Sequence, residues 1–220
     1  MIQIHGLALD AADGTLLMEE VALSVPKGGR HLLTGSSGSG KSRLLRVVAG
    51  TERPARGRVA VAGRDLWPGD GALAHMGRLS LGLAFATGGL LSNLSLRDNI
   101  ALPMRMRGVP AQDWQDRAEG ALRRLGLQAV AGLRPHAVSA AARKLVNLAR
   151  VLALDPDVIL LDDPLEGLDA ADHSAALEVI HGWVSEGKTL LAAQEEPGAL
   201  AELATGRLDL NAHLVPRETP

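Results

Sequence analysis

The chain has 220 residues, of which 46% are hydrophobic and 22% are charged, as expected for a globular protein with a sizeable core. Its formal net charge of -2 gives no bulk attraction to nucleic acid or to an anionic membrane surface, so we expect no nucleic-acid partner. The absence of cysteine excludes disulfides and thiolate metal sites, and no run approaches the roughly 18 uncharged apolar residues that span a bilayer.

The N-terminal part of the chain predicts a β-rich layer. Residues 2–9 and 21–25 alternate apolar and polar side chains, which predicts two strands joined by a turn around 12–14. Residues 51–57 predict a loop, and residues 59–62 a further strand. This pattern indicates an α/β fold in which an antiparallel β layer precedes the remaining elements.

Residues 31–50 carry a phosphate-binding loop, because a short apolar run breaks into glycines and serines and then resumes as an apolar helix pattern. Glycine permits positive φ and lets backbone N–H groups approach phosphate oxygens, while the N-terminus of the following helix favours an anion. A flexible linker is the alternative, but a linker needs neither a strand before it nor an amphipathic helix after it. The predicted nucleotide-binding residues are Gly35, Ser36, Ser37, Gly38, Ser39, Gly40, Lys41 and Ser42.

Two of these side chains have specific expected roles. Lys41 can reach the β- and γ-phosphates, and the Ser42 hydroxyl can ligate Mg²⁺. The predicted cofactors are therefore ATP and Mg²⁺.

The middle of the chain predicts one strand followed by helices. Residues 79–85 predict the strand, and apolar side chains at helical spacing predict helices over 111–125 and 140–154, the second ended by an Asp-Pro pair. We interpret residues 87–155 as an inserted helical subdomain. The arginines of this block are interpreted as a solvated helix surface rather than a binding patch. They are Arg105, Arg107, Arg123, Arg124 and Arg143.

Acidic residues follow a buried strand in the last third of the chain. Four apolar residues at 158–161 predict that strand. Ligands of open α/β sheets bind at the carboxyl ends of strands, so we expect Asp162 to bind Mg²⁺ next to Ser42. A helix over 170–186 and another buried strand over 189–193 complete the pattern.

Taken together, these pieces resemble the nucleotide-binding subunit of ABC transporters over about residues 2–210. The matching stretches are GSSGSGKS at 35–42, GLLSNLSLRDNIALP at 89–103 and NLARVLALDPDVILLDDPLEGLD at 147–169. Small-molecule kinases that share the phosphate loop lack this order of motifs. The segment after Gly89 is most similar to subunits that serve lipid or lipoprotein transport across the bacterial inner membrane, including Mla/Mce phospholipid systems.

The resemblance implies one nucleotide-binding domain over 1–220, with a P-loop NTPase core of parallel strands, an N-terminal antiparallel β layer and a helical subdomain inserted at about 87–155. It implies a cytoplasmic ATP-binding subunit, peripheral on the inner face of the cell membrane, with a membrane-spanning permease docked near 86–103. Two such subunits, as a homodimer or heterodimer, sandwich two ATPs. Ser139 and Asp169 belong to the nucleotide-binding residues that the resemblance implies.

Four positions depart from the family pattern. Ala86 stands where the family has a glutamine that contacts Mg²⁺ or the attacking water. The signature L-S-G-G-Q reads V-S-A-A-A at 138–142, where each alanine adds a Cβ and restricts positive φ. Asp163 replaces the general-base glutamate with a shorter side chain, and Gln194 replaces a histidine with an amide that cannot exchange a proton near neutral pH. By resemblance, Asp163 and Gln194 are the catalytic residues.

These departures, beside an intact phosphate loop and intact Asp162 and Asp169, predict ATP binding with weak or absent hydrolysis. The alternative is that Asp163 and Gln194 support slow turnover. Two other classes stay open: a nucleotide-sensing regulatory P-loop protein outside transport, and a small-molecule P-loop kinase, for which no acceptor site is legible in the sequence.

Overall fold

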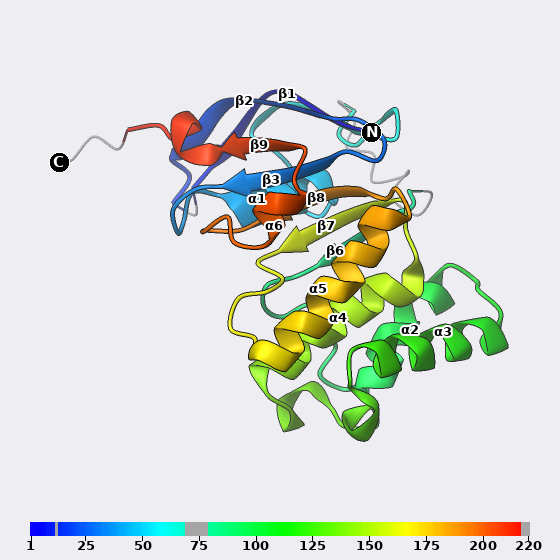
Figure 1. Cartoon of the computed structure of the whole chain (residues 1–220). Coiled ribbons are helices and arrows are strands. Elements are labelled where there is room, and N and C mark those ends of the chain that lie inside the picture. The colour runs from blue at the N-terminus through cyan, green and yellow to red at the C-terminus, as the bar shows by residue number, and fades with distance from the viewer. Residues whose placement is uncertain (12, 69–78, 217–220) are drawn as a thin grey trace. The chain divides into compact units, whose positions relative to one another are not determined.

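A computed structural model describes residues 1–11, 13–68 and 79–216 of the chain. The chain forms two compact units (Figure 1): the first comprises Met1–Leu81 and Thr189–Pro220, and the second comprises Gly82–Lys188. Within the described ranges, every helix is too short or too polar to cross a membrane.

The first unit contains an antiparallel sheet built from the N-terminal part of the chain. Alternate side chains of its first strand, among them Ile2 and Ile4, are buried, as a period of two predicts. The two predicted N-terminal strands are present and pair antiparallel, but the second begins at Leu16 rather than at Val21. Ala12 of the predicted turn lies outside the described residues. The strands of this sheet are β1 (Ile2–Asp10), β2 (Leu16–Val25), β4 (Arg56–Val61) and β5 (Arg64–Asp65). They lie side by side in the order β2-β1-β4-β5.

Strand β4 begins inside the predicted loop, which corrects the expected boundary. Arg56 pairs with Ala8 of β1, so the ladder extends further than the apolar pattern indicated. Gly57 makes this possible, because its φ is 94° and its backbone lies directly against β1. A Cβ at Gly57 would lie 2.5 Å from both the Gly6 carbonyl oxygen and the Leu7 Cα. Only glycine fits this close approach of two backbones.

Replacing Gly57 with alanine is expected to lower the free energy of unfolding by about 2–4 kcal/mol, because left-handed strain adds to a backbone clash. Gly63 offers a matched control: its φ is also positive, at 76°, but a Cβ there meets nothing within 4 Å. Gly63→Ala should therefore cost only about 1 kcal/mol. Denaturant unfolding of both variants measures the difference, and equal losses would show that the approach to β1 is unimportant.

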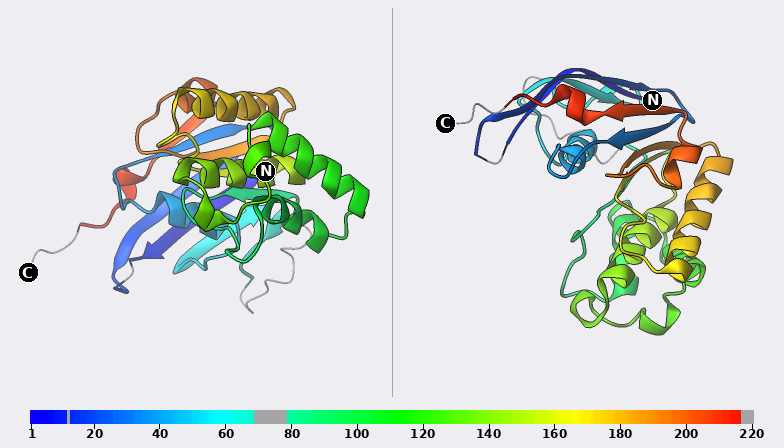
Figure 2. Two further views of the ribbon diagram at one scale, coloured as in Figure 1. Left: turned by 90° about the horizontal axis from the view of Figure 1, so that it is seen from below. Right: turned by 60° about the vertical axis from the view of Figure 1, so that its left-hand side comes forward.

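Three parallel strands of this unit belong to a second sheet. β3 (Arg30–Thr34) pairs with β8 (Thr189–Ala193) on one side and with β9 (Gly206–Asp209) on the other. Every residue of β8 is buried, as its apolar run predicted. β9 was not predicted, because its sequence GRLD offers a single large apolar side chain. In Figures 1 and 2 the antiparallel sheet lies next to β3 and β9.

Helix α1 (Lys41–Val48) follows β3 and contacts strands of both sheets, β4 and β8. Its apolar face buries Leu44, Leu45 and Val48, which fixes the direction in which the N-terminus of the helix points. The strand, loop and helix predicted around the glycine-rich stretch are therefore confirmed. A short helix, α6 (Leu200–Leu203), also contacts β3.

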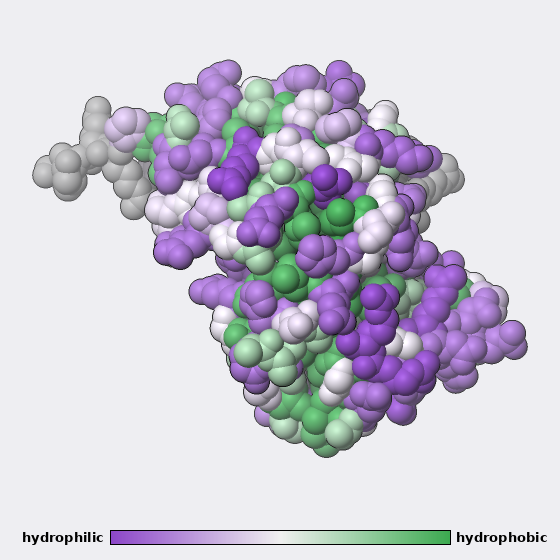
Figure 3. Space-filling model, in the orientation of Figure 1, coloured by the Kyte–Doolittle hydropathy of each residue, from purple (hydrophilic) through white to green (hydrophobic). Residues whose placement is uncertain are grey.

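The second unit contains strands and a group of helices (Figure 1). The elements are β6 (Leu81–Ala84), α2 (Leu96–Met106), α3 (Ala111–Arg124), α4 (Ala140–Leu154), β7 (Val158–Asp162) and α5 (Ala170–Ser185). β6 is shorter than the strand predicted at 79–85. Helix α4 contacts α2, α3 and α5, and Figure 3 shows the α3 side of the unit covered mostly by hydrophilic residues.

The bounds of α4 match the sequence prediction, because both ends carry local signals. Ser139 caps the first turn, its hydroxyl accepting a hydrogen bond from the Ala142 N–H at 3.0 Å. At the other end Asp155 adopts a left-handed conformation, with φ at 53°, and Pro156 cannot continue the helix. The helix therefore begins and ends where residues adjacent in sequence dictate.

Candidate functional site

The glycine-rich loop of the first unit runs from the end of β3 to the start of α1. Gly35, Gly38 and Gly40 all have positive φ, at 146°, 79° and 91°. A Cβ at Gly35 would lie 2.6 Å from the Ser39 hydroxyl oxygen, and one at Gly40 would collide with the Met18 side chain. The loop therefore needs glycine at these positions, and its backbone curves as a phosphate cradle requires.

Lys41 lies over this loop. Its side-chain Nζ donates to the carbonyl oxygens of Gly35 and Ser36, at 2.7 and 3.0 Å, and the residue is only 7% exposed. These bonds hold a positive charge above the cradle before any anion arrives. The N-terminus of α1 lies directly behind it, and its N-cap residue, Gly40, offers no side chain to satisfy the first N–H groups.

Two hydroxyls complete the loop. The Ser39 hydroxyl is buried and has no hydrogen-bond partner among the described residues, so it can donate to a bound oxygen. Ser42 lies half-buried in the first turn of α1, and its hydroxyl is a hard oxygen ligand of the kind that Mg²⁺ prefers. The arrangement fits the triphosphate of ATP with its magnesium ion.

Two residues that the motif does not contain hold the outer side of the loop. The Asn211 amide oxygen accepts from the Ser36 backbone N–H at 3.1 Å and from its hydroxyl at 2.9 Å. A carboxylate oxygen of Glu195 accepts from the Ser37 N–H at 3.3 Å. Sequence reasoning missed both. Glu195 could have been found from its place directly after Gln194, whereas nothing local marks Asn211.

Glu195→Gln is expected to tighten ATP binding about three- to tenfold at low salt, because it removes a negative charge beside a loop that binds phosphates. Equilibrium titration with a fluorescent ATP analogue measures the change. Glu196→Gln is the matched control, since the neighbouring glutamate is exposed and undergoes the same change of charge. An equal gain in both variants would assign the effect to net charge alone.

Gln194, one of the two predicted catalytic residues, lies just past β8. Its backbone N–H donates to the Leu33 carbonyl oxygen at 3.0 Å, which anchors it beside the end of β3. Its side-chain carbonyl oxygen is buried and has no partner among the residues that the structure describes. A buried amide of this kind can offer either its oxygen or, after a flip, its NH₂ donor to a bound group.

In the second unit, β7 ends at Asp162, which is 7% exposed. Asp163 follows with a φ of 42°, an uncommon backbone conformation for a residue with a side chain. Lys144 of α4 holds this turn, because its Nζ donates to the carbonyl oxygens of Asp163 and Glu166 at 2.7 and 2.6 Å. Burial lowers the pKa of Lys144, while the carboxylates of Glu166, Asp163 and Asp162 act in the opposite direction. Sequence reasoning missed this lysine.

The remaining predicted nucleotide-binding residues, Ser139 and Asp169, are exposed helix caps in the second unit. Asp169 begins α5, and its carboxylate accepts from the Asp172 N–H at 2.9 Å. Burial, together with the charge of Asp169, raises the pKa of Asp172. Both caps therefore have a visible structural role, and their contact with a nucleotide stays a prediction.

The altered signature begins helix α4, and this corrects one expectation. Ala140 and Ala141 lie in its first turn, so the positive φ that alanine would restrict does not arise there. Together with Ala86 they line a cavity of about 300 Å³, whose polar wall includes Lys144 and Glu166. Two of the four departures, Ala86 and the altered signature, thus lie around one space, which their small side chains leave open.

The predicted site residues divide between the two units. The phosphate loop and Gln194 belong to the first unit, and the second contains Ser139, Asp162, Asp163 and Asp169. Ser42 and Asp162, the predicted magnesium ligands, belong to different units, so their joint coordination stays a prediction.

Comparison with known proteins gives a consistent family. The model of the ABC transporter family matches residues 18–166. The lipoprotein-releasing system ATP-binding protein LolD of Chromohalobacter salexigens is 30% identical over 96% of this chain and 94% of its own length. The methionine import ATP-binding protein MetN of Cereibacter sphaeroides is 34% identical over 86% of this chain. The chain spans about half, 54%, of that MetN protein.

The fold also matches solved structures. The structure of MJ0796, described as a bacterial ABC transporter cassette, has a TM-score of 0.85 with 22% sequence identity, and the match covers 96% of this chain and 95% of that one. At this identity the similarity shows the fold. The predicted fold class is confirmed: an α/β cassette with a P-loop, a parallel sheet, an N-terminal antiparallel sheet and added helices.

Proposed function

This chain belongs to the ABC transporter family, and from that premise we propose that it is an ATP-binding subunit that binds Mg-ATP at a subunit interface and hydrolyses it slowly or not at all. One combination of features carries the proposal: the phosphate loop at 35–42 is complete, whereas four positions with catalytic roles in the family are replaced. Binding and hydrolysis depend on different residues, so one can persist without the other.

The binding half rests on the first unit. The backbone of the loop offers N–H groups, the N-terminus of α1 favours an anion, and Lys41 supplies a point charge. When bound, ATP supplies the γ-phosphate that water can attack, and Mg²⁺ neutralises the charge that develops on it. Ser42 is the proposed ligand of that ion from this unit, and Asp162 the one from the second unit.

The hydrolysis half rests on side-chain chemistry and reach. Asp163 retains a carboxylate but is shorter than glutamate by one methylene, and a displacement near 1 Å can cost about 10²-fold in rate. Lys144 donates a hydrogen bond to the carbonyl oxygen of Asp163 and so holds the backbone there in place. This bond opposes a backbone shift that would compensate for the shorter side chain. Gln194 can hydrogen-bond a phosphate oxygen but cannot exchange a proton near neutral pH.

Transport requires partners that this chain does not contain. We propose a dimer of ATP-binding subunits, a separate membrane-spanning permease docked near residues 86–103, and a cytoplasmic position against the membrane. The helices within 87–155 are the proposed inserted subdomain of a single nucleotide-binding domain. A lipid- or lipoprotein-type cargo is favoured by the similarity to LolD along nearly the full length of both chains.

The first test measures binding and turnover on the same purified protein. We expect saturable Mg-ATP binding with a hydrolysis rate at least about 10²-fold below that of an ordinary family member assayed alongside. Turnover equal to that member, abolished by Asp163→Asn, would overturn the proposal of weak hydrolysis while leaving the family assignment intact.

The second test identifies the partner. Purification from detergent-solubilised membranes of the native host should recover a membrane-spanning permease in stoichiometric amounts. ATP binding without any membrane partner would favour a nucleotide-sensing regulatory protein. ADP formation that depends on a second small substrate would favour a kinase.

A further inference from the structure

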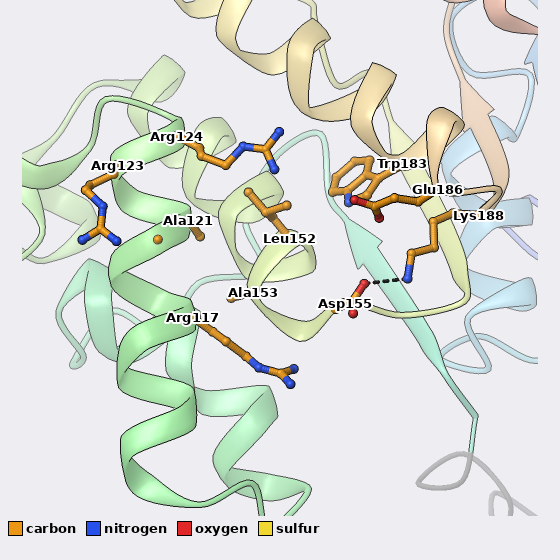
Figure 4. Close-up of a pocket in the computed structure, with 11 residues that line it drawn as sticks. Arg117, Ala121, Arg123, Arg124, Leu152, Ala153, Asp155, Trp183, Glu186 and Lys188 are labelled. Atoms are coloured by element: carbon orange, nitrogen blue, oxygen red, sulfur yellow. Dashed lines mark hydrogen bonds and ion pairs between the residues drawn. The ribbon is translucent and has the colours of Figure 1, made fainter.

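A second cavity, of about 740 Å³, lies in the second unit between α3, α4 and the C-terminal end of α5. Arg117, Gly120, Ala121, Arg123 and Arg124 line it from α3. All of them except Arg123 are spaced three or four residues apart, which places them on one face of that helix. In Figure 4 the side chains of Arg117 and Arg124 extend toward α4 and α5, whereas Arg123 points the other way. Two guanidinium groups therefore share one side of this space.

The floor of the cavity is apolar. Ala121, Ala153 and Trp183 are each no more than 3% exposed, and Leu152 stands between α3 and the indole of Trp183 in Figure 4. Leu152 is the partly exposed side chain of this floor, so covering it with an apolar group is favourable. The cavity thus combines a charged side with a surface suited to an aliphatic or aromatic body.

The two sides of the cavity differ in net charge. The Lys188 Nζ and a carboxylate oxygen of Asp155 form an ion pair at 2.5 Å, so their charges neutralise each other. Glu186 is the other acid on that wall. Arg117 and Arg124 have neither a hydrogen bond nor an ion pair to any residue that the structure describes. The arginine side therefore carries positive charge that no ion pair in the described part of the chain neutralises.

Two glycines inside helices keep this space open. Glycine destabilises a helix interior relative to alanine, so glycines inside helices need a structural explanation. A Cβ at Gly120 would meet nothing within 4 Å, which means that packing does not require glycine and that a side chain would project into the cavity. A Cβ at Gly182 of α5 would lie 3.4 Å from an Arg124 guanidinium nitrogen, so glycine there leaves room for that guanidinium.

We propose that this cavity binds a small molecule that carries a carboxylate or a phosphate on an apolar body. Arg117 and Arg124 stand two turns apart on α3, and the planar guanidinium group of either one binds the oxygens of such an anion in a bidentate manner. The body covers Leu152 beside the buried Trp183, and the carboxylate of Glu186 opposite fixes the orientation by repelling the anion. The volume lies in the range of small-molecule sites. This binding is independent of the phosphate loop.

The ordinary interpretation of a row of helix arginines is a solvated surface, and this is what the sequence pattern predicts. It accounts for Arg123, which points away from α4 and α5. It does not account for Arg117 and Arg124, whose side chains extend toward α4 and α5 over buried apolar side chains. Nor does it account for Gly120 on the same helix face, where a Cβ would meet nothing within 4 Å. The placement of the side chains, rather than the number of charges, distinguishes a site from a surface.

Isothermal titration of the full chain with 1-naphthyl phosphate tests the proposal, with inorganic phosphate and 1-naphthylmethylammonium as comparison probes. We expect the naphthyl phosphate to bind with a Kd of about 1 mM or tighter, and both comparison probes to bind at least about tenfold more weakly. The double variant Arg117→Gln/Arg124→Gln should weaken naphthyl phosphate binding at least about tenfold. Gly120→Leu should have a similar effect by filling the cavity.

Three controls make the result specific. Arg134→Gln removes the same charge from an exposed position of the second unit and should leave the Kd unchanged. Lys41→Met disables the phosphate loop and should also leave it unchanged. Glu186→Gln should leave binding equal or tighter. Circular dichroism and thermal unfolding establish that each variant is folded.

The proposal is overturned if naphthyl phosphate does not bind, if the cationic probe binds as well, or if the arginine and Gly120 variants, shown to be folded, bind like the parent. Loss of binding in Lys41→Met would also overturn it, because the probe would then occupy the phosphate loop. None of these outcomes bears on ATP binding, so the proposed function is tested separately.

Discussion

Replacing Lys41 with methionine is expected to weaken Mg-ATP binding at least about a hundredfold, to the limit of detection by equilibrium titration. The ammonium group is 7% exposed and lies above the loop on the carbonyl oxygens of Gly35 and Ser36. Methionine fills similar space but carries no charge and no donor. The phosphates would then interact only with backbone N–H groups and the N-terminus of α1. The ammonium group that offsets their negative charge would be missing.

Controls separate this effect from a loss of structure. Lys27→Met makes the same chemical change at an exposed turn and should leave the affinity unchanged. The two loop carbonyls lose their donor in Lys41→Met, so thermal unfolding without nucleotide must show that the variant is folded. A folded Lys41→Met protein that binds ATP like the parent would refute the assignment of the phosphate loop.

Restoring the family residues is expected to raise the rate of ATP hydrolysis about a hundredfold or more. The variant combines Ala86→Gln, Asp163→Glu and Gln194→His. Glutamate recovers the missing methylene of the general base, histidine recovers a group that exchanges protons near neutral pH, and glutamine recovers a ligand near the ion. Each acts on the same step, so the single changes should have smaller effects than the combination.

A steady-state assay of phosphate release, with saturating Mg-ATP, measures this gain. Adding Lys41→Met to the restored protein should abolish the new activity, which excludes a contaminating ATPase. If the restored protein binds ATP but turns it over no faster, the replaced side chains are not what limits hydrolysis. The altered signature at 138–142 would then be the next feature to test.

The sequence predicted elements well where the signals were local. Helix α4 was bounded correctly, because Ser139 and the Asp-Pro pair that follows Leu154 mark its ends within a few residues. β9 escaped prediction because its only reason to be a strand is its pairing with β3, which is far away in the sequence. The early start of β4 has the same origin, since Arg56 is ordered by Ala8. A strand that is stabilised by pairing with a distant segment carries little signal in its own few residues.

The site follows the same division. The phosphate loop is a local motif, and the structure gives it the backbone that the motif predicts. Lys144, Asn211 and Glu195 were missed, because each acts on a segment that is distant in the chain. Which residue a long side chain reaches is decided by folding, so a motif cannot contain it. The roles implied for Ser139 and Asp169 stay predictions, because in this chain alone both are seen as helix caps.

The bonds made by Lys144 have a consequence for how this protein could change over generations. The lysine donates hydrogen bonds to two main-chain carbonyl oxygens of the turn after β7. Every amino acid supplies the same carbonyl, so these two bonds do not depend on which side chains stand at 163 and 166. The carboxylates of Asp163 and Glu166 add an attraction to the ammonium group that a neutral replacement would remove. A lineage could therefore exchange the residue at position 163 and keep the two main-chain anchors of the turn.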